Sequence, residues 1–375
     1  MQLPHFKLER YFARYEFTVE RLLCCSDCES LKIGDLLDLE PDARRRFGDQ
    51  WLGYTESQGS PALRQQISRL YRTISPEQIL VHSGAEEAIF LFMHALLEPD
   101  DHVVVHWPCY QSLEAVAAGI GCRVTRWEAQ EERGWALDLD QLLRHLRSDT
   151  KAIVINLPHN PTGYVMQRDQ FAEVVDIARS HGITLFSDEV YRESEYAPED
   201  RLPAACDLDK HAVSLGVMSK TYGLAGLRIG WIATRDVRVY ERMAGLKDYT
   251  TICNSAPSEF LAELALRHRE ALIERNVGII TDNLALLDKF FQRHHSLFSW
   301  ERPKAGPIAF PRLLDGESDQ FCDRVVQEAG VLLLPGTVFG DVGNHFRIGF
   351  GRGDAAEGLA RLEAYLRAQQ GGTWG

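Results

Sequence analysis

Short apolar segments alternate with amphipathic segments between about residues 60 and 235 of this 375-residue chain. The apolar segments predict strands at 79–82, 102–107, 123–127, 151–156 and 183–187, and the amphipathic ones predict helices at 84–97, 110–118, 139–146 and 168–181. Strands such as AIVIN are apolar on consecutive residues, which is typical of strands that helices cover on both faces. The sequence therefore predicts an α/β fold around a mostly parallel sheet.

The rest of the chain predicts a second, smaller α+β domain. After about residue 235 helical periodicity dominates, and it is followed by the strand patterns VLLLPG and HFRIGF and the helical segment AAEGLARLEAYLRAQ. At roughly 150 residues per domain, the chain is long enough for two or three domains. We expect a large domain over residues 45–265 and a small domain formed by residues 1–44 and 266–375.

Composition narrows the classes of function. Forty-one Lys and Arg against 54 Asp and Glu give a net charge of −13, which argues against a nucleic-acid partner. The sequence shows neither a leader pattern nor an apolar run near the roughly 18 residues of a membrane span, so we expect a cytoplasmic protein without a membrane partner. Eight cysteines are too few for a disulfide framework. Cys24, Cys25 and Cys28 lie close enough in the sequence to form a zinc site or a redox pair. Because no second pair of metal ligands follows at a suitable spacing, we expect no bound metal.

Several polar residues follow predicted strands, and ligands of open α/β sheets bind at those strand ends. Gly84, Ala85 and Glu86 follow one strand and open a helix, whose free N–H groups would face an anion. Asn160 lies in the rigid loop NLPHNPTG, where its amide can donate a hydrogen bond. Each of these features alone is also consistent with an ordinary turn.

Charged residues stand in similarly unusual places. Asp188 comes directly after the apolar strand ITLFS, where a buried carboxylate needs a cation or hydrogen-bond donors, and Tyr191 follows in SDEVY. Lys220 lies between two apolar runs, eight residues before Arg228, in SKTYGLAGLRIGW. A lone lysine is usually a solvated surface residue, but this context indicates a site. Arg347 lies in the alternating apolar strand HFRIGF, where an unpaired guanidinium would be unfavourable.

Taken together, these motifs resemble the pyridoxal 5'-phosphate site of the fold-type-I aminotransferases (class I and II). NLPHNPTG, SDEVY, SKTYGLAGLRIGW and FRIGFG occur in the family's order at compatible spacings, and the resemblance covers essentially the whole chain. LLLPGTVFGDVGNHFRIGFG and KDYTTICNSAPSE show a looser likeness to the branch that contains capreomycidine synthase. The resemblance implies an aspartate aminotransferase-like large domain, a smaller α+β domain, and pyridoxal 5'-phosphate as the cofactor.

The resemblance implies catalytic and ring-binding roles for single residues. Lys220 would join the cofactor's aldehyde as a Schiff base and would then move the proton at the substrate's Cα. Asp188 would pair with the pyridine nitrogen and keep it protonated. Asn160 and Tyr191 would hydrogen-bond the ring oxygen, and Tyr110 would stack on the ring face.

The resemblance also implies the phosphate contacts. The helix start at Gly84, Ala85 and Glu86, together with Ser219 and Arg228, would bind the phosphate. Val217 stands where the family often has Ser or Thr, so we expect one phosphate hydrogen bond fewer. Tyr54 in GYTESQG matches a tyrosine that reaches the phosphate of the neighbouring subunit, which implies a homodimer with two shared sites.

Substrate contacts are implied on the other side of the cofactor. Arg347 would bind the substrate α-carboxylate through paired hydrogen bonds, and Asn160 would lie beside it. Gly34, in SLKIGDLLDLEP, is expected as an approximate neighbour of the substrate. Arg352 is expected to be exposed. Side-chain specificity is expected from residues 10–40, the regions of Tyr110 and 249–255, and the small-domain strands.

The reaction implied is transamination, in which an L-amino acid gives its amine to a 2-oxo acid. The same residues support other chemistry that begins at Cα, so elimination or cyclisation at Cβ of an arginine-derived amino acid, as in the capreomycidine synthase branch, stays open. A third hypothesis is a non-catalytic module that binds the cofactor. The complete set of lysine, aspartate and arginine argues against that module.

Overall fold

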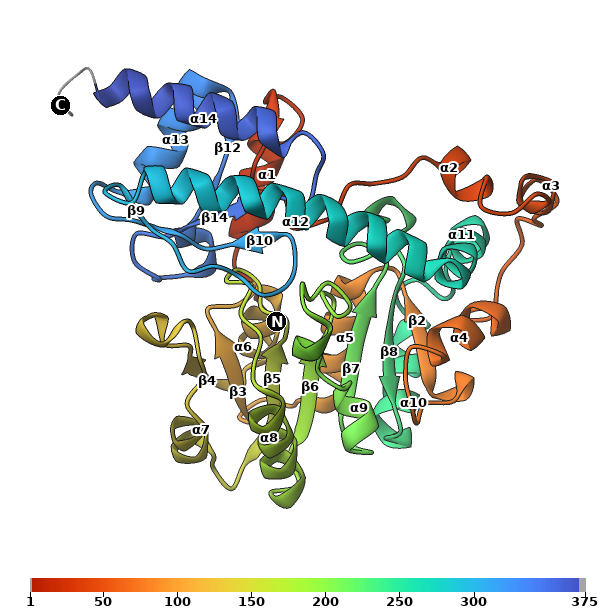
Figure 1. Ribbon diagram of the computed structural model, residues 1–375. Helices are drawn as coiled ribbons and strands as arrows, with labels where there is room; N and C mark the ends of the chain where they lie inside the picture. Colours follow the sequence, from red (N-terminus) through yellow and green to blue (C-terminus); the bar gives the residue numbers. More distant parts are fainter. Residues whose placement is uncertain (1, 371–375) are drawn as a thin grey trace.

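The computed structural model describes residues 2–370, and its largest element is a seven-stranded sheet (Figure 1). The strand order is β2 (Ile79–His82), β8 (Gly230–Thr234), β7 (Val213–Val217), β6 (Thr184–Asp188), β5 (Thr150–Asn156), β3 (His102–Trp107) and β4 (Arg123–Glu128). β8 runs antiparallel to both β2 and β7, and the other neighbouring pairs are parallel. The predicted α/β fold with a mostly parallel sheet is confirmed.

Helices cover both faces of this sheet because its strands are apolar on both sides. Val103 and Val105 of β3 pack into one core with helices α5, α6 and α10, whereas Val104 between them packs into another core with α7 and α8. Successive side chains of a strand point to opposite faces, so consecutive valines supply both cores. The helices are α5 (Ala85–Leu96), α6 (Ser112–Ile120), α7 (Leu139–His145), α8 (Arg168–Ser180), α9 (Ala205–Leu208) and α10 (Val237–Lys247).

A second group of elements lies above the sheet in Figure 1. Its strands form three small sheets: β10 (Ile308–Ala309), β14 (Phe346–Gly349) and β13 (Leu334–Pro335); β1 (Arg21–Leu22) and β12 (Val331–Leu332); and β9 (Phe298–Ser299) and β11 (Arg312–Leu313). α13 (Ser318–Ala329) and α14 (Ala355–Gln370) pack on them, and Leu23 and Cys28 join their hydrophobic core from near the start of the chain. The predicted VLLLPG strand is interrupted at Leu333 because β12 and β13 pair with different partners.

The helix α12 (Arg269–Arg293) runs from this upper group toward α11 (Ala256–Arg267) beside the large sheet (Figure 1). The predicted large-domain end at residue 265 falls inside α11. The predicted domain division, 45–265 against both chain ends, stays a prediction. Short 3-10 helices complete the fold: η1 (Pro76–Gln78), η2 (Glu131–Arg133), η3 (Pro198–Asp200), η4 (Ala225–Leu227) and η5 (Gly336–Phe339).

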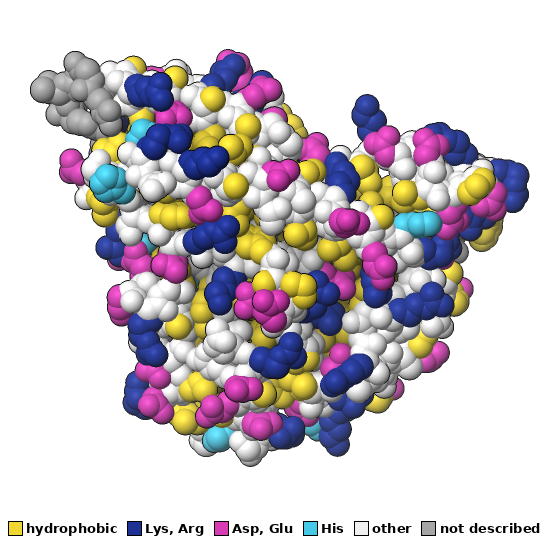
Figure 2. Space-filling model, in the orientation of Figure 1, with side chains coloured by type: hydrophobic (Ala, Val, Ile, Leu, Met, Phe, Trp, Pro, Cys, Tyr) yellow, Lys and Arg dark blue, Asp and Glu magenta, His cyan; other side chains and the backbone are white. Residues whose placement is uncertain are grey.

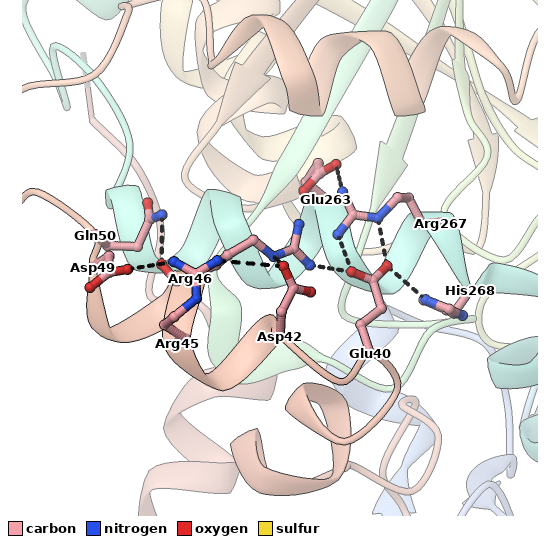
Figure 3. Close-up of polar contacts among 9 residues, drawn as sticks. All are labelled: Glu40, Asp42, Arg45, Arg46, Asp49, Gln50, Glu263, Arg267 and His268. Carbon is pink, nitrogen blue, oxygen red and sulfur yellow. Dashed lines mark hydrogen bonds and ion pairs between the residues drawn. The ribbon is translucent and has the colours of Figure 1, made fainter.

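The N-terminal segment begins with α1 (Lys7–Tyr15) against the upper group and then crosses the molecule. Beyond the crossing it forms α2 (Ile33–Leu37) and α3 (Ala43–Gly48), a lobe that projects in Figure 2, before α4 (Pro61–Ser68). Glu40 fastens this lobe to α11, because its carboxylate accepts hydrogen bonds from Arg46, Arg267 and His268 (Figure 3). The lobe is therefore held by charge-assisted hydrogen bonds.

The described residues also bear on membrane and metal binding. Within residues 2–370, no helix is both long and apolar enough to cross a membrane. The same part of the chain contains no group of three or more His, Cys, Asp or Glu arranged to hold a metal ion. Cys24, Cys25 and Cys28 are buried free thiols.

Candidate active site

A cavity of about 420 Å³ opens at the carboxyl ends of the parallel strands. Its lining includes the last residues of three neighbouring strands, Asn156 of β5, Asp188 of β6 and Val217 of β7. Parallel strands end at the same edge of a sheet, so the loops that follow them meet there. The cavity brings together most of the site residues predicted from the sequence: Ala85, Glu86, Tyr110, Asn160, Asp188, Tyr191, Ser219, Lys220, Arg228 and Arg347.

Lys220 reaches the cavity from the segment that follows β7. Its amine donates a hydrogen bond to Ser26 Oγ at 2.8 Å. Ser26 also lines the cavity, and it comes from the N-terminal crossing segment 194 positions away. The lysine amine is therefore fixed where the large sheet meets the upper group of elements, and it is open to a ligand.

Asp188 is the most deeply buried carboxyl group of the cavity, with 4% of the residue exposed. Its Oδ1 accepts a hydrogen bond from the backbone N–H of Val190 at 3.2 Å. Burial raises the pKa of this carboxyl to about 7, although the Val190 N–H and the charge of Lys220 lower it. A cationic group bound beside the carboxyl would favour its ionised form, so the position suits the protonated nitrogen of a heterocycle.

Two asparagines connect the loops that follow β5 and β6. Asn156 donates from Nδ2 to the backbone carbonyl of Asp188 at 3.0 Å and accepts from the backbone N–H of Asn160 at 2.7 Å. Tyr191 is 1% exposed, and its hydroxyl has no hydrogen-bond partner within residues 2–370. A buried hydroxyl without a partner costs about 1–3 kcal/mol, so this one is suited to a polar atom of a ligand.

An anion site forms where α5 begins. Gly84 precedes the helix with φ of +85°, and a Cβ there would lie 2.5 Å from Nη2 of Arg228. Glycine is required both by this backbone conformation and by the approach of the guanidinium. A Cβ on Gly230, at the start of β8, would lie 2.7 Å from the carbonyl carbon of Gly84. The helix N-terminus, Arg228 and the buried Ser219 thus surround a space that suits a phosphate.

Arg347 on β14 lines the cavity from the upper group of elements and is 1% exposed. Nε and Nη2 donate to the backbone carbonyl of Cys24 at 3.1 and 2.8 Å, and Nη1 donates to Asn160 Oδ1 at 3.1 Å. The guanidinium is therefore not unsatisfied, but it forms no ion pair with a carboxylate in the described part of the chain. A buried cation held by neutral acceptors is suited to bind a carboxylate ligand.

Tyr110 lies in the cavity as predicted, whereas Gly34 and Tyr54 lie outside it. Tyr110 lines the cavity and donates to Glu9 Oε1 at 3.4 Å. Gly34 lies on α2 with its carbonyl bonded to Arg44, and Tyr54 is 83% exposed. Neither Gly34 nor Tyr54 lines the cavity of the single chain. Their predicted roles remain predictions.

The sequence missed two sets of cavity residues. Glu9, Phe12 and Glu16 line the cavity from α1 and the residue after it. The broad expectation for residues 10–40 included Phe12 and Glu16 but not Glu9. Arg352, expected to be exposed, lines the cavity instead and donates to both carboxylate oxygens of Asp27 at 3.0 and 2.9 Å. That expectation was wrong because the pairing carboxylate is 325 positions away in the sequence.

Comparison with known proteins gives a consistent result. The family model described as "Aminotransferase class I and II" matches residues 26–361. Capreomycidine synthase from Streptomyces vinaceus is 29% identical over 380 aligned residues, which cover 99% of this chain and 97% of that protein.

Solved structures agree with the observed architecture. A PLP-dependent aminotransferase from Streptococcus suis superposes with a TM-score of 0.92 at 35% identity, covering 98% of this chain and 99% of that one. The PLP-dependent cyclase OrfR superposes with a TM-score of 0.90 at 29% identity, covering 98% of both chains. The similarity therefore extends over nearly the whole chain.

The described residues fit pyridoxal 5'-phosphate, the cofactor that the family match and the solved relatives imply. The close approach of Gly84 and Arg228 forms a cradle that a Cβ would fill. The Tyr191 hydroxyl is left without a partner by the described residues, and the buried carboxyl of Asp188, with its raised pKa, has no cation paired with it there. Lys220 supplies the amine that an aldehyde needs.

Proposed function

The chain belongs to the class I and II family of pyridoxal-phosphate-dependent aminotransferases, and from this premise we propose that it moves the amine of an L-amino acid to a 2-oxo acid. The observation that carries the proposal is one cavity lined by Lys220, Asp188 and Arg347. These three side chains supply an amine, a carboxylate and a carboxylate-binding cation within reach of one small molecule.

Lys220 is proposed as the catalytic base and acid. When bound, pyridoxal 5'-phosphate supplies an electron sink for the carbon that carries the substrate's amino group. The Lys220 amine would take the proton from that carbon and deliver it to the aldehyde carbon (C4′) of the cofactor. Its hydrogen bond to Ser26 at 2.8 Å supports this role, because it holds the amine at the cavity surface.

Asp188, Asn160 and Tyr191 are proposed to bind the cofactor ring. The Asp188 carboxylate would accept a hydrogen bond from the ring nitrogen and keep a proton there; its burial in the cavity supports this role, because a buried carboxylate is stabilised by a cation beside it. Asn160 and Tyr191 would contact the ring oxygen, and the unpartnered Tyr191 hydroxyl supports this assignment. Tyr110 would cover the ring face.

The phosphate is proposed to bind where α5 begins. The backbone N–H groups at Gly84, Ala85 and Glu86 would donate to it together with Ser219, and Arg228 would supply a positive charge. Val217, which ends β7 in the cavity wall, has no hydroxyl to add to these contacts.

Arg347 is proposed to bind the substrate α-carboxylate beside Asn160. Its three hydrogen bonds fix the plane of the guanidinium, and a fixed plane would orient the bond from the α-carbon to its hydrogen. Because no carboxylate of the described chain pairs with Arg347, the positive charge is left for the ligand.

A homodimer is proposed as the functional unit. Trp51, Leu52 and Tyr54 follow α3 in the chain and are 80%, 81% and 83% exposed. Three large side chains exposed in one short segment favour contact with a second subunit. In such a dimer Tyr54 would reach the partner's phosphate site, and Gly34 would lie near a substrate. We also propose a cytoplasmic location, which the free thiols support.

Cyclisation or elimination at Cβ is the second candidate reaction. The 29% identity to capreomycidine synthase over 99% of the chain, and the similarity to the cyclase OrfR, favour it. Both reactions would begin with the same proton transfer by Lys220. They differ in whether a group leaves from the substrate's next carbon.

One experiment separates the two reactions. The cofactor-loaded protein is mixed with a panel of amino acids, with and without a 2-oxo acid. The absorbance band of the bound cofactor and the reaction products are followed. Transamination would bleach the band and give a new 2-oxo acid, with the amine recovered on the acceptor. Loss of water or ammonia, or a cyclic product, without an acceptor would favour the second candidate. A band that no amino acid changes would refute both reactions and support a non-catalytic module.

A further inference from the structure

Two buried histidines lie close in the chain to cavity residues but have no role in the proposed chemistry. His106 of β3 and His159 of the loop after β5 are each 1% exposed, and neither lines the cavity. Their rings stack with centroids 3.8 Å apart and planes 16° apart. Burial lowers the pKa of His159 to about 3 and holds the pKa of His106 well below its usual range. Both rings are therefore neutral, and neither is placed to exchange a proton with a ligand.

The edge of the His159 ring forms two short hydrogen bonds. Nε2 lies 2.7 Å from the backbone carbonyl oxygen of Pro108, and Nδ1 lies 2.7 Å from Thr162 Oγ1. Because a carbonyl oxygen can only accept, Nε2 carries the proton and donates it. Nδ1 of the neutral ring then accepts from the Thr162 hydroxyl, whose oxygen accepts the backbone N–H of Tyr164 at 3.2 Å. A single tautomer satisfies both ring nitrogens.

The bond to Pro108 joins two loops that carry proposed cofactor contacts. Pro108 directly follows β3 and lies two positions before Tyr110, which lines the cavity and is assigned above to the ring face. His159 directly precedes Asn160, which lines the cavity and is assigned to the ring oxygen. One imidazole therefore sets the spacing between the loop that covers the ring and the loop that contacts its oxygen.

Further hydrogen bonds carry the position of His159 to the Asn160 amide. The backbone N–H of His159 donates to the carbonyl of Tyr164 at 3.0 Å, and the N–H of Gly163 donates to the carbonyl of His159 at 2.8 Å, so the loop is closed on itself. Oδ1 of Asn160 accepts from Arg347 Nη1 at 3.1 Å. The Nδ2 group of Asn160 is thereby turned into a donor for the ligand.

We propose that His159 is a positioning residue that holds Asn160 and Tyr110 in place against the cofactor ring. The bond to Pro108 sets the spacing of the two loops, and the stacked ring of His106 keeps the imidazole from tilting. The inference rests on the proposed function, from which the two ring contacts are taken. A histidine that only stabilised the loops would leave the absorbance of the bound cofactor unchanged, so the two roles differ in a measurable property.

The test compares two amide variants of the cofactor-loaded protein. In His159→Gln the amide nitrogen can occupy the position of Nε2 and donate to Pro108, whereas the shorter side chain of His159→Asn reaches only as far as Nδ1 and loses that bond. A hydrogen bond from Asn160 stabilises the ionised ring oxygen, so a weaker bond should raise the pH midpoint at which the cofactor's absorbance band changes.

The size of the shift follows from one weakened hydrogen bond. We expect His159→Asn to raise the pH midpoint by roughly 0.5–1 pH unit and the Kd of pyridoxal 5'-phosphate roughly two- to tenfold. His159→Gln should stay close to the wild-type protein in both values. Should His159→Asn not fold, His106→Leu is measured in its place. It keeps both hydrogen bonds of His159, removes only the stacked ring, and should raise the midpoint in the same direction.

A matched buried histidine controls for lost stability. His102 begins β3, at the end of the strand opposite to Trp107, and its ring nitrogens lie 2.8 Å from Thr150 Oγ1 and 2.8 Å from Thr125 Oγ1. His102→Asn also breaks buried hydrogen bonds, so it should lower the urea midpoint of unfolding as His159→Asn does. It should leave the pH midpoint of the absorbance band and the Kd of the cofactor unchanged.

Three results would overturn the inference: an unchanged pH midpoint and Kd in His159→Asn, or in His106→Leu where that variant replaces it; equal shifts in His159→Asn and His159→Gln; or equal shifts in His159→Asn and His102→Asn. Failure of the proposed function looks different. If the wild-type protein takes up cofactor but no amino acid changes its absorbance band, the proposed reaction is refuted while the pH titrations still test His159. If the wild-type protein takes up no cofactor, the proposed function and the inference are both refuted.

Discussion

Replacing Arg347 by lysine tests the assignment of the substrate carboxylate site. The substitution keeps a positive charge in the cavity but removes the planar guanidinium with its fixed donors. Arg347 donates three hydrogen bonds to Cys24 and Asn160, and its remaining N–H groups are available to a ligand. A lysine amine would contact a carboxylate as a point charge.

The expected magnitude follows from the bonds that are lost. A hydrogen bond between charged groups contributes about 1.5–3 kcal/mol, so losing one of the two bonds to the α-carboxylate would lower kcat/KM about 10- to 150-fold. The acceptors at Cys24 and Asn160 would lose their donor in a buried setting, which would lower the free energy of unfolding by about 1–3 kcal/mol.

Steady-state kinetics and urea denaturation of the cofactor-loaded protein measure the two effects. An amine that lacks the α-carboxylate serves as the control substrate, because its already slow reaction should be unaffected by the change. Arg312→Lys, on a nearby exposed arginine of β11, controls for the loss of any guanidinium. If Arg347→Lys left kcat/KM for the amino acid unchanged, Arg347 would not bind the carboxylate.

Two further changes have expected outcomes. Because burial raises the pKa of Asp188 to about 7 from about 4 in the unfolded chain, the folded cofactor-free protein binds more protons, and this group makes stability fall as the pH rises from about 4 to 7. Asp188→Asn should therefore raise the free energy of unfolding of the cofactor-free protein more at pH 7.5 than at pH 5, by about 2–3 kcal/mol in urea titrations, and an equal effect at both pH values would contradict the pKa. Glu40→Gln should lower the free energy of unfolding by about 1 kcal/mol, because it weakens the bonds from Arg46, Arg267 and His268, and an unchanged urea midpoint would mean that these bonds do not stabilise the lobe.

The large sheet was predictable because strands that are buried on both faces have apolar side chains at consecutive positions of the sequence. The predicted strands at 79–82 and 102–107 match β2 and β3. Both strands are apolar on consecutive residues and are followed by turn residues, Ser83 and Pro108, so their limits are local properties of the chain. The cavity edge followed from the same pattern, since Asn156, Asp188 and Val217 each end a predicted or apolar segment.

The contacts between distant segments were not predictable from local pattern. Arg352 follows the last strand, where exposure is the usual expectation, and its partner Asp27 lies near the other end of the chain. Glu9 and Glu16 have no local feature that marks them as cavity residues, because α1 is held at the cavity by contacts with distant segments, such as those with Gln111 and Leu333. For Tyr54 the required neighbour would belong to a second subunit.

The covalent site of the cofactor is the central claim, and reduction followed by peptide mapping tests it most directly. Cofactor-loaded protein is treated with sodium borohydride, digested and analysed by mass spectrometry, with Lys220→Ala as the control. The account predicts the added mass of the reduced cofactor on the peptide that contains Lys220 and none in the variant. The modification on another lysine, or an equally labelled variant, would contradict it.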